Sequence, residues 1–359
     1  MTEPFTDIDI SGGEPVMVRY SSGWEKLDVD GWTYDDVEAF IASIDKDWYD
    51  NIKGDKISIN YPTDEWTLRV TAYLAFGGTR PMLSIRRTPR YPITMAQAGL
   101  PGTILLMTEN PRGLVLNVGA TGSGKSTTTA CLVQHINEKR KAKIITIEDP
   151  IEYLYVPEKA TFAQREVGVD TPTFYEGVRG AMRQRPDVIV IGEIRDRETA
   201  ETALMAGESG HLVLATLHAN SAFGAIQKML GFFPGEHDVR MISLANCLVG
   251  VINHVMVPAL DSKQSILATE LLFNHKQQIS PILMASADAS SSRTSVDIRA
   301  KIEDFIINKK DGISRSLVDS LLELIRGKRV SASDALFAVT GQGSVYDALR
   351  DALRAQASI

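Results

Sequence analysis

Nine consecutive residues have the types and the spacing of a loop that cradles phosphate groups. In order they are Gly119, Ala120, Thr121, Gly122, Ser123, Gly124, Lys125, Ser126 and Thr127, and they fit the pattern G-x-x-x-x-G-K-[ST]. Glycines let backbone N–H groups turn toward phosphate oxygens, and a helix N-terminus adds positive dipole. We expect Lys125 to reach the β- and γ-phosphates of ATP and the Ser126 hydroxyl to bind Mg²⁺. The strand-like run Leu114–Val118 before the loop and a helix after it disfavour a glycine-rich turn that binds nothing.

Two acidic residues follow other apolar runs. Lys143–Glu148 ends on a carboxylate, and Val188–Ile191 is followed by Gly192 and Glu193. In open α/β sheets, ligands bind beyond the carboxyl ends of the strands. We expect Glu148 to polarise the attacking water and Glu193 to organise Mg²⁺ and its waters. Both acids compete for the role of catalytic base, and the sequence does not separate them.

A histidine and several arginines complete the set of candidate site residues. His218 follows the apolar run Leu212–Thr216, where a neutral imidazole can sense the γ-phosphate, whereas His211 is interpreted as a core residue. Arg69 and Arg86 lie on predicted strands far earlier in the chain. An arginine from a separate domain can reach the γ-phosphate only when domains or subunits close, which would couple hydrolysis to motion.

The elements that must position these residues follow from the pattern. Apolar runs alternate with helical stretches from residue 114, which predicts a parallel sheet covered by helices. Before it, a small α+β unit is predicted from the helix Tyr34–Ile44 and the strands Lys56–Asn60, Trp66–Tyr73 and Met82–Arg87. Arg86–Pro92 is interpreted as a linker. After it, Ala285–Ser295 is predicted to be a mobile loop, followed by the helices Ser316–Arg326 and Ser333–Val339.

Composition excludes several classes of protein. The chain has 359 residues, of which 44% are hydrophobic and 23% charged, as in a folded globular protein. Its net charge of −7 argues against a protein that coats nucleic acid. Cys131 and Cys247 form no C-x-x-C pair, so neither a zinc ribbon nor a disulfide framework is expected. No signal peptide or transmembrane segment is expected, because the apolar run Leu244–Leu260 is too polar for a span and is interpreted as buried core.

Four blocks, in their order and spacing, resemble the secretion superfamily of hexameric ATPases, which drive type II secretion, type IV pili and type IV secretion. The blocks are Gly119–Thr127, Ile145–Tyr153, Arg185–Asp196 and Ser209–Ala222. The last three resemble the family's Asp box, atypical Walker B and His box. The resemblance carries the catalytic roles onto Glu148, Glu193 and His218, and places Arg69 and Arg86 where the family's N-terminal domain sends arginines to the nucleotide.

The resemblance also implies an architecture and partners. The implied fold is α/β: a RecA-like P-loop core with a parallel-rich sheet at 93–275, a small N-terminal α+β (PAS-like) domain and linker at 1–92, and a helical C-terminal region at 276–359. It further implies a homo-hexamer in the bacterial cytoplasm that uses ATP and Mg²⁺. Such a ring would associate with the inner membrane through components of a secretion or pilus machine, without direct binding of nucleic acid.

The branch of the family is inferred from features in which this sequence differs from particular branches. Pilus- and secretin-type assembly ATPases carry long N-terminal extensions and usually a tetracysteine zinc site, and this sequence shows neither. The segment Asp297–Asp304 keeps only part of the C-terminal motif of retraction ATPases. We therefore expect a motor for type IV secretion or conjugative transfer, resembling the type IVB systems, with pilus retraction as the alternative. A RecA-like motor that translocates nucleic acid is the alternative of another class, and an ATP-binding scaffold without turnover is disfavoured by the intact site.

Overall fold

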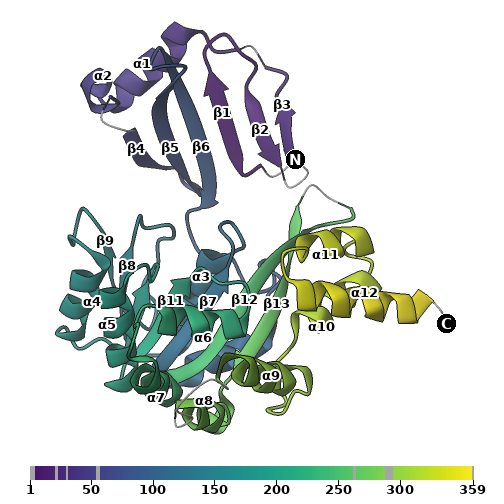
Figure 1. The fold of residues 1–359 in the computed structure, drawn as a ribbon. Helices are drawn as coiled ribbons and strands as arrows, with labels where there is room; N and C mark the ends of the chain where they lie inside the picture. Colours follow the sequence, from purple (N-terminus) through teal and green to yellow (C-terminus); the bar gives the residue numbers. More distant parts are fainter. Residues whose placement is uncertain are drawn as a thin grey trace. The chain divides into compact units, whose positions relative to one another are not determined.

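The computed structural model describes residues 5–20, 23–29, 31–53, 57–261, 264–287 and 294–357. The chain divides into two compact units (Figure 1). The first ends at Tyr91 and takes in Pro258–Ser265, and the second comprises the remainder from Pro92 onward. The further division at residue 275, which would separate a C-terminal helical region, stays a prediction.

The first unit is an antiparallel sheet with a helix on one face. Its described strands are β1 (Asp7–Ser11), β2 (Met17–Tyr20), β3 (Gly23–Lys26), β4 (Ile57–Pro62), β5 (Trp66–Ala75) and β6 (Arg80–Pro89), in the spatial order β3-β2-β1-β6-β5-β4. The predicted helix is confirmed as α1 (Tyr34–Ile44), and the single turn α2 (Trp48–Asn51) follows it. A capping box between Thr33 and Asp36 starts α1, which buries Val37 and Ile41 in the core of this unit.

Two sequence expectations for this unit were wrong or incomplete. The pattern identified β4, β5 and β6 but missed β1, β2 and β3, which are only four or five residues long. The predicted linker from Arg86 is wrong, because β6 continues to Pro89, which pairs with Trp66 of β5. Proline is accepted there because the pairing of β6 with β1 ends at Arg86, so β6 is an edge strand at Pro89.

The second unit is built on the predicted parallel sheet. Its strands are β7 (Gly113–Gly119), β8 (Lys143–Glu148), β9 (Thr161–Glu166), β10 (Val188–Ile191), β11 (Leu212–Leu217), β12 (Leu248–Pro258) and β13 (Ser265–Phe273). Their order is β13-β12-β7-β11-β10-β8-β9, and the pairings from β12 to β9 are all parallel. Every residue of β7, β10 and β11 is buried, as their continuous apolar sequences predict.

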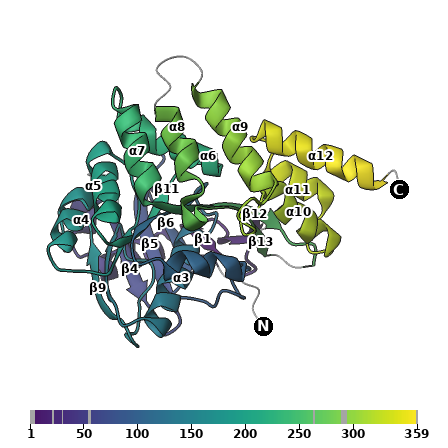
Figure 2. The same cartoon turned by 90° about the horizontal axis from the view of Figure 1, so that it is seen from below.

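Helices cover both faces of this sheet (Figure 2). On one face lie η1 (Gly102–Glu109) and α3 (Lys125–Lys139). On the other lie α4 (Phe174–Met182), α5 (Arg197–Glu208), α6 (Ala222–Gly231), α7 (His237–Cys247), α8 (Ser280–Ala287) and α9 (Thr294–Ile307). The turn η2 (His275–Gln277) precedes α8, and α10 (Leu317–Arg326), α11 (Ala332–Ala338) and α12 (Gly343–Ala357) pack around the ends of β12 and β13.

The remaining expectations concern the C-terminal half. The run Leu244–Leu260 contains the end of α7 and the buried strand β12, so its interpretation as core is confirmed. The predicted loop Ala285–Ser295 is wrong at both ends, because residues 285–287 belong to α8 and residues 294–295 to α9; residues 288–293 lie outside the described part. Among the helices that the structure describes, none combines the length and the apolar character needed to cross a bilayer.

Candidate nucleotide-binding and catalytic site

The phosphate loop connects the central strand β7 to α3. Gly122 and Gly124 have φ angles of 76° and 92°, a backbone conformation that favours glycine. At Gly119, a Cβ atom would lie 2.5 Å from Ser123 Oγ and 2.8 Å from the carbonyl oxygen of His254. The loop therefore closes tightly on itself and on β12 at Gly119, where a side chain would open it, whereas side chains at Gly122 and Gly124 would strain its backbone. Its amides and the N-terminus of α3 form the kind of cradle that holds phosphate.

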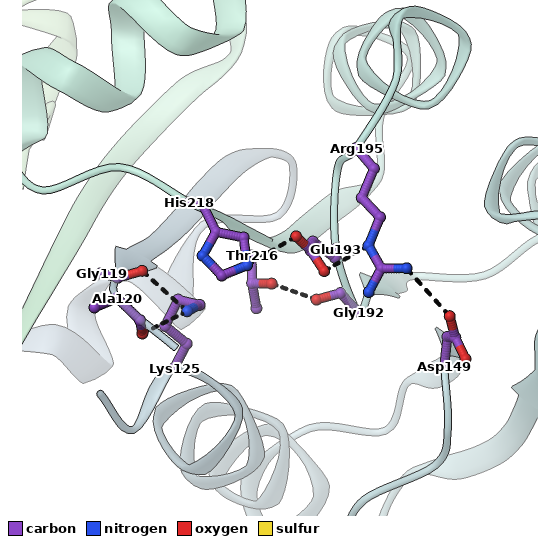
Figure 3. A network of polar contacts seen from close by, with 9 residues as sticks. All are labelled: Gly119, Ala120, Lys125, Asp149, Gly192, Glu193, Arg195, Thr216 and His218. Atoms are coloured by element: carbon purple, nitrogen blue, oxygen red, sulfur yellow. Dashed lines mark hydrogen bonds and ion pairs between the residues drawn. The ribbon is translucent and has the colours of Figure 1, made fainter. Parts of the chain in front are cut away.

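Lys125 lies at the mouth of this cradle (Figure 3). It is 9% exposed, and its Nζ donates hydrogen bonds to the carbonyl oxygens of Gly119 at 3.0 Å and Ala120 at 2.8 Å. Burial lowers the pKa of Lys125, while the carboxylates of Glu193 and Glu152 act in the opposite direction. The ammonium group is thus held by weak carbonyl acceptors inside the loop, where a phosphate would be a stronger, charged acceptor.

Glu193 lies at the centre of a polar network (Figure 3). Its Oε1 is 2.9 Å from Nε2 of His218, and its Oε2 accepts a hydrogen bond from Nε of Arg195 at 2.7 Å. Nη1 of Arg195 also donates to Oδ2 of Asp149 at 3.3 Å. The side chain of Glu193 is only 17% exposed. The structure thus brings the two sequence-predicted residues Glu193 and His218 into direct contact.

Arg195 and Asp149 are the members of this network to which the sequence analysis gave no role. Arg195 stands two residues after Glu193, at the carboxyl end of β10, and Asp149 stands at the carboxyl end of β8. Because β10 and β8 are neighbouring parallel strands, an arginine beyond one end faces an acid beyond the other. The opposite charges at matching strand ends were the signal that could have identified the pair.

Glu148 has a different environment from Glu193. Its Oε1 is buried without a hydrogen-bond partner among the described residues, and its Oε2 accepts a long hydrogen bond of 3.4 Å from the backbone N–H of Glu152. Burial raises the pKa of Glu148 to about 7, against the smaller, lowering effect of the nearby side chains of Thr146 and Gln164. A carboxylate with this pKa can accept a proton from water near neutral pH, which a general base must do.

The loop that follows Glu148 has no regular structure, yet the edge strand β9 holds its backbone. Glu166 accepts a hydrogen bond from the Ile151 N–H at 3.1 Å, and Gln164 accepts one from the Tyr155 N–H at 3.2 Å. Gln164 also donates through Nε2 to the Tyr153 carbonyl oxygen at 2.8 Å. Two side chains of one strand therefore fix three residues of the loop.

His254 on β12 forms the floor under the phosphate loop. It is 1% exposed, and its Nδ1 and Nε2 lie 2.8 Å from the Val118 carbonyl oxygen and from Oγ1 of Thr128. Because a carbonyl only accepts, Nδ1 carries the proton and Nε2 accepts from the threonine hydroxyl. Burial lowers the pKa of His254 to about 4, so the ring stays neutral. Sequence reasoning noted this residue only as a polar interruption of an apolar run.

Mg²⁺ has two predicted ligands, Ser126 and Glu193. Ser126 follows Lys125 in the first turn of α3, and its neighbour Thr127 shares a hydrogen bond of 2.9 Å with the Tyr153 hydroxyl. No group of three or more His, Cys, Asp or Glu side chains that could hold a metal occurs among the described residues. Such a cage is not needed, because nucleotide-bound Mg²⁺ takes one or two protein oxygens and completes its shell with phosphates and water. The donor set fits that arrangement.

The two predicted arginines belong to the first unit. Arg69 on β5 and Arg86 on β6 are direct partners in the antiparallel register. Arg86 also forms an ion pair with Asp7, with 2.8 Å between Nε and Oδ1. The structure thus places both arginines side by side on one sheet, and their action on a nucleotide stays a prediction.

Comparison with known proteins identifies relatives for most of the chain. The family model described as "Type II/IV secretion system protein" matches residues 53–338. The uncharacterized protein YggR of Escherichia coli is 42% identical over 194 residues, which are 54% of this chain and 59% of YggR, so less than two thirds of that relative is spanned. The type IV pilus retractation ATPase PilT of Pseudomonas aeruginosa is 35% identical over 254 residues, which are 70% of this chain and 74% of PilT.

Two solved structures share the fold over nearly the whole chain. The ATPase DotB of Legionella pneumophila matches with a TM-score of 0.81 and 24% identity, covering 94% of this chain and 92% of DotB. The pilus retraction motor PilT, solved with bound ADP, matches with a TM-score of 0.75 and 30% identity, covering 93% of each chain. The expected RecA-like α/β fold is confirmed by these matches. The chain belongs to the type II/IV secretion system protein family.

Proposed function

We propose that this chain hydrolyses ATP and uses the energy to drive a secretion or pilus machine. The observation that carries this proposal is the pair of acids beside the phosphate loop. Glu148 ends β8 and Glu193 lies just beyond β10, a neighbouring strand of the sheet that also carries the loop. A protein that only binds nucleotide has no need of a half-buried carboxylate with a pKa near neutrality at that edge.

Each residue then has a defined part in turnover. The loop amides and Lys125 bind the phosphates. Ser126 would hold Mg²⁺, and Glu193 would organise the ion and its waters; when bound, Mg²⁺ would neutralise developing phosphate charge. Glu148 accepts a proton from the attacking water. His218 contacts Glu193 directly, so a change at the carboxylate is transmitted to the segment after β11. Glu148 is the better base of the two, because one of its oxygens makes no hydrogen bond within the described residues, whereas both oxygens of Glu193 have partners.

The motor is proposed to be a homo-hexameric ring in the bacterial cytoplasm. Arg69 and Arg86 of one subunit would complete the nucleotide site of its neighbour, so that hydrolysis depends on closure. The ring would act on inner-membrane components of its machine, with no direct binding of nucleic acid. The similarity to PilT, a motor that was solved with bound ADP, supports the use of an adenine nucleotide.

The first candidate machine is type IV secretion or conjugative transfer of the type IVB kind. It is supported by the segment Asp297–Asp304, which keeps only part of the motif of retraction ATPases. Pilus retraction is the second candidate, and the 35% identity with the retractation ATPase PilT favours it. Deletion of the gene separates them: loss of substrate or DNA transfer supports secretion, whereas loss of twitching with pili retained supports retraction.

ATP hydrolysis itself is tested by phosphate release from the purified chain with Mg²⁺. We expect Lys125→Ala to abolish nucleotide binding and Glu148→Gln to bind ATP but release phosphate at least about a hundredfold more slowly. Lys228→Ala, on the last turn of α6, is a matched control that should turn over normally. Unchanged turnover in both site variants would refute the assignment, and strong stimulation by single-stranded DNA would support a nucleic-acid motor instead.

A further inference from the structure

The short segment between His218 and α6 is anchored from two neighbouring strands. The carbonyl oxygen of Asn220 accepts a hydrogen bond of 3.0 Å from Nδ2 of Asn253 on β12. The backbone N–H of Ala222, the first residue of α6, donates to Oε2 of Glu270 on β13 at 2.8 Å. Both anchors lie within four residues of His218.

The two anchoring side chains also hold each other. Nδ2 of Asn253 lies 3.3 Å from Oε2 of Glu270, so one carboxylate oxygen accepts hydrogen bonds from both the asparagine and the helix. Asn253 is 1% exposed. Nothing in the proposed reaction uses either residue, and Figure 1 shows their strands, β12 and β13, beside each other in the sheet.

We propose that Glu270, together with Asn253, is a positioning residue that sets where His218 meets Glu193. This proposal rests on the proposed ATPase function, because it concerns the same site. A residue of the edge strand β13 would thus influence a reaction that takes place beyond the ends of the central strands.

The backbone on the two sides of His218 explains why such an anchor matters. On one side, β11 is fixed by its pairing with β7 as far as Leu217. On the other side, strand pairing does not hold residues 218–221, and Ser221 accepts hydrogen bonds from the Gly224 and Ala225 N–H groups of α6. The imidazole must nevertheless reach Glu193 at 2.9 Å. Without the anchors on Asn220 and Ala222, this end of the short segment would be held only by the packing of α6 against the core.

Helix geometry favours a hydrogen-bond acceptor at this position, and burial raises the pKa of Glu270 to about 7. The N–H groups in the first turn of a helix have no partner within the helix, and negative charge is stabilised there. Glu270 satisfies the first of these groups, whereas Ser221 satisfies the third. A glutamine at position 270 keeps an acceptor oxygen for both N–H donors, while an alanine removes it.

The test is a double-mutant cycle on the rate of phosphate release by the full chain at saturating ATP. We expect Glu270→Ala to lower kcat by between about tenfold and a hundredfold with KM for ATP unchanged, as for a misplaced catalytic group. Glu270→Gln should keep kcat within about threefold of wild type, because the amide oxygen replaces the carboxylate oxygen. His218→Ala should lower kcat by a similar factor, and adding Glu270→Ala to it should cause no further loss.

A matched control separates positioning from general loss of stability. Ser331 caps α11 by accepting the Asp334 N–H at 3.0 Å, far along the chain from the site. Ser331→Ala should lower the melting temperature and leave kcat unchanged. If Glu270→Ala does not fold, Asn253→Ala enters the same cycle, because it removes the anchor on the Asn220 carbonyl and leaves the carboxylate in place.

The outcomes separate the two proposals. If the wild-type chain releases no phosphate, the proposed function is refuted. If the wild type is active, two results would refute the positioning role. In the first, the double variant loses kcat by the product of the two single-variant factors. In the second, kcat is unchanged in either single variant. Equal losses in the two single variants and the double variant, with recovery in Glu270→Gln, would establish it.

Discussion

His254 offers the sharpest test of how the phosphate loop is supported. Replacement by leucine keeps a buried side chain of similar size but removes both ring nitrogens. The carbonyl oxygen of Val118 and the hydroxyl of Thr128 would then lose their partners at 2.8 Å in a site that excludes water. An orphaned buried polar group costs about 1–3 kcal/mol, so two such groups predict a loss of about 2–6 kcal/mol.

The same residue predicts a dependence of stability on pH. Burial lowers the pKa of His254 to about 4, below its ordinary value of 6.5. As the pH falls below 6.5, His254 becomes protonated in the unfolded chain but stays neutral in the folded chain until the pH approaches 4. The contribution of neutral His254 to the free energy of unfolding is therefore complete above pH 6.5 and is lost as the pH falls toward 4. Between pH 8 and pH 5 the loss amounts to about 2 kcal/mol, which the leucine variant should not show.

The stability of the two units can be followed separately. Amide hydrogen exchange on β7 and α3 reports the opening of the second unit around the phosphate loop. The four tryptophans, Trp24, Trp32, Trp48 and Trp66, all belong to the first unit, so their fluorescence serves as an internal control. We expect His254→Leu to lower protection in β7 and α3 while fluorescence-detected unfolding stays unchanged. Equal protection at pH 8, or an equal fall of protection between pH 8 and pH 5 in both proteins, would refute the reasoning.

Three further predictions concern turnover. Wild-type phosphate release should rise as the pH increases through about 7, because only the ionised form of Glu148 is a base; Glu148→Gln should leave a slow, flat profile, and a wild-type limb centred near 4.5 would contradict this assignment. Arg195→Gln should lower kcat at least about tenfold at constant nucleotide affinity, measured by fluorescent-ATP titration, whereas Arg197→Gln, on the next helix, should not. Arg69→Ala and Arg86→Ala should each reduce kcat by at least about a hundredfold, and normal turnover in both would remove them from the site.

The sequence predicted four strands of the central sheet, β7, β8, β10 and β11, because their apolar runs are largely buried. It missed β9, β12 and β13, of which β9 is partly exposed along its whole length. Lys143–Glu148 and Val188–Ile191 coincide with β8 and β10. Such continuous apolar runs leave little choice of structure. The strands β1, β2 and β3 lack this signal, since each is short and partly exposed and mixes polar with apolar side chains. Their pairing depends on contacts with residues as distant as Ile85, which a local pattern does not contain.

The residues of the candidate site likewise divide into those that the sequence identified and those that it missed. Lys125 and Glu193 belong to motifs in which residue type and spacing follow from the chemistry, so the sequence was sufficient to identify them. His254, Asn253 and Glu270 act through hydrogen bonds between strands that are far apart in sequence, and nothing in their neighbourhood along the chain indicates a function. Only the order of the strands reveals that β12 lies beside the strand that carries the loop.

The attachment of the Glu148 loop to β9 has a consequence for the entropy of nucleotide binding. Gln164 and Glu166 fix the backbone at Ile151, Tyr153 and Tyr155 in the protein as described. Ordering one residue costs about 1–2 kcal/mol, so a loose loop of this length would consume several kcal/mol each time ATP entered. Here that ordering takes place once, when the chain folds. In the proposed ATPase, binding of ATP would therefore not have to order this loop, and release of ADP would not have to disorder it.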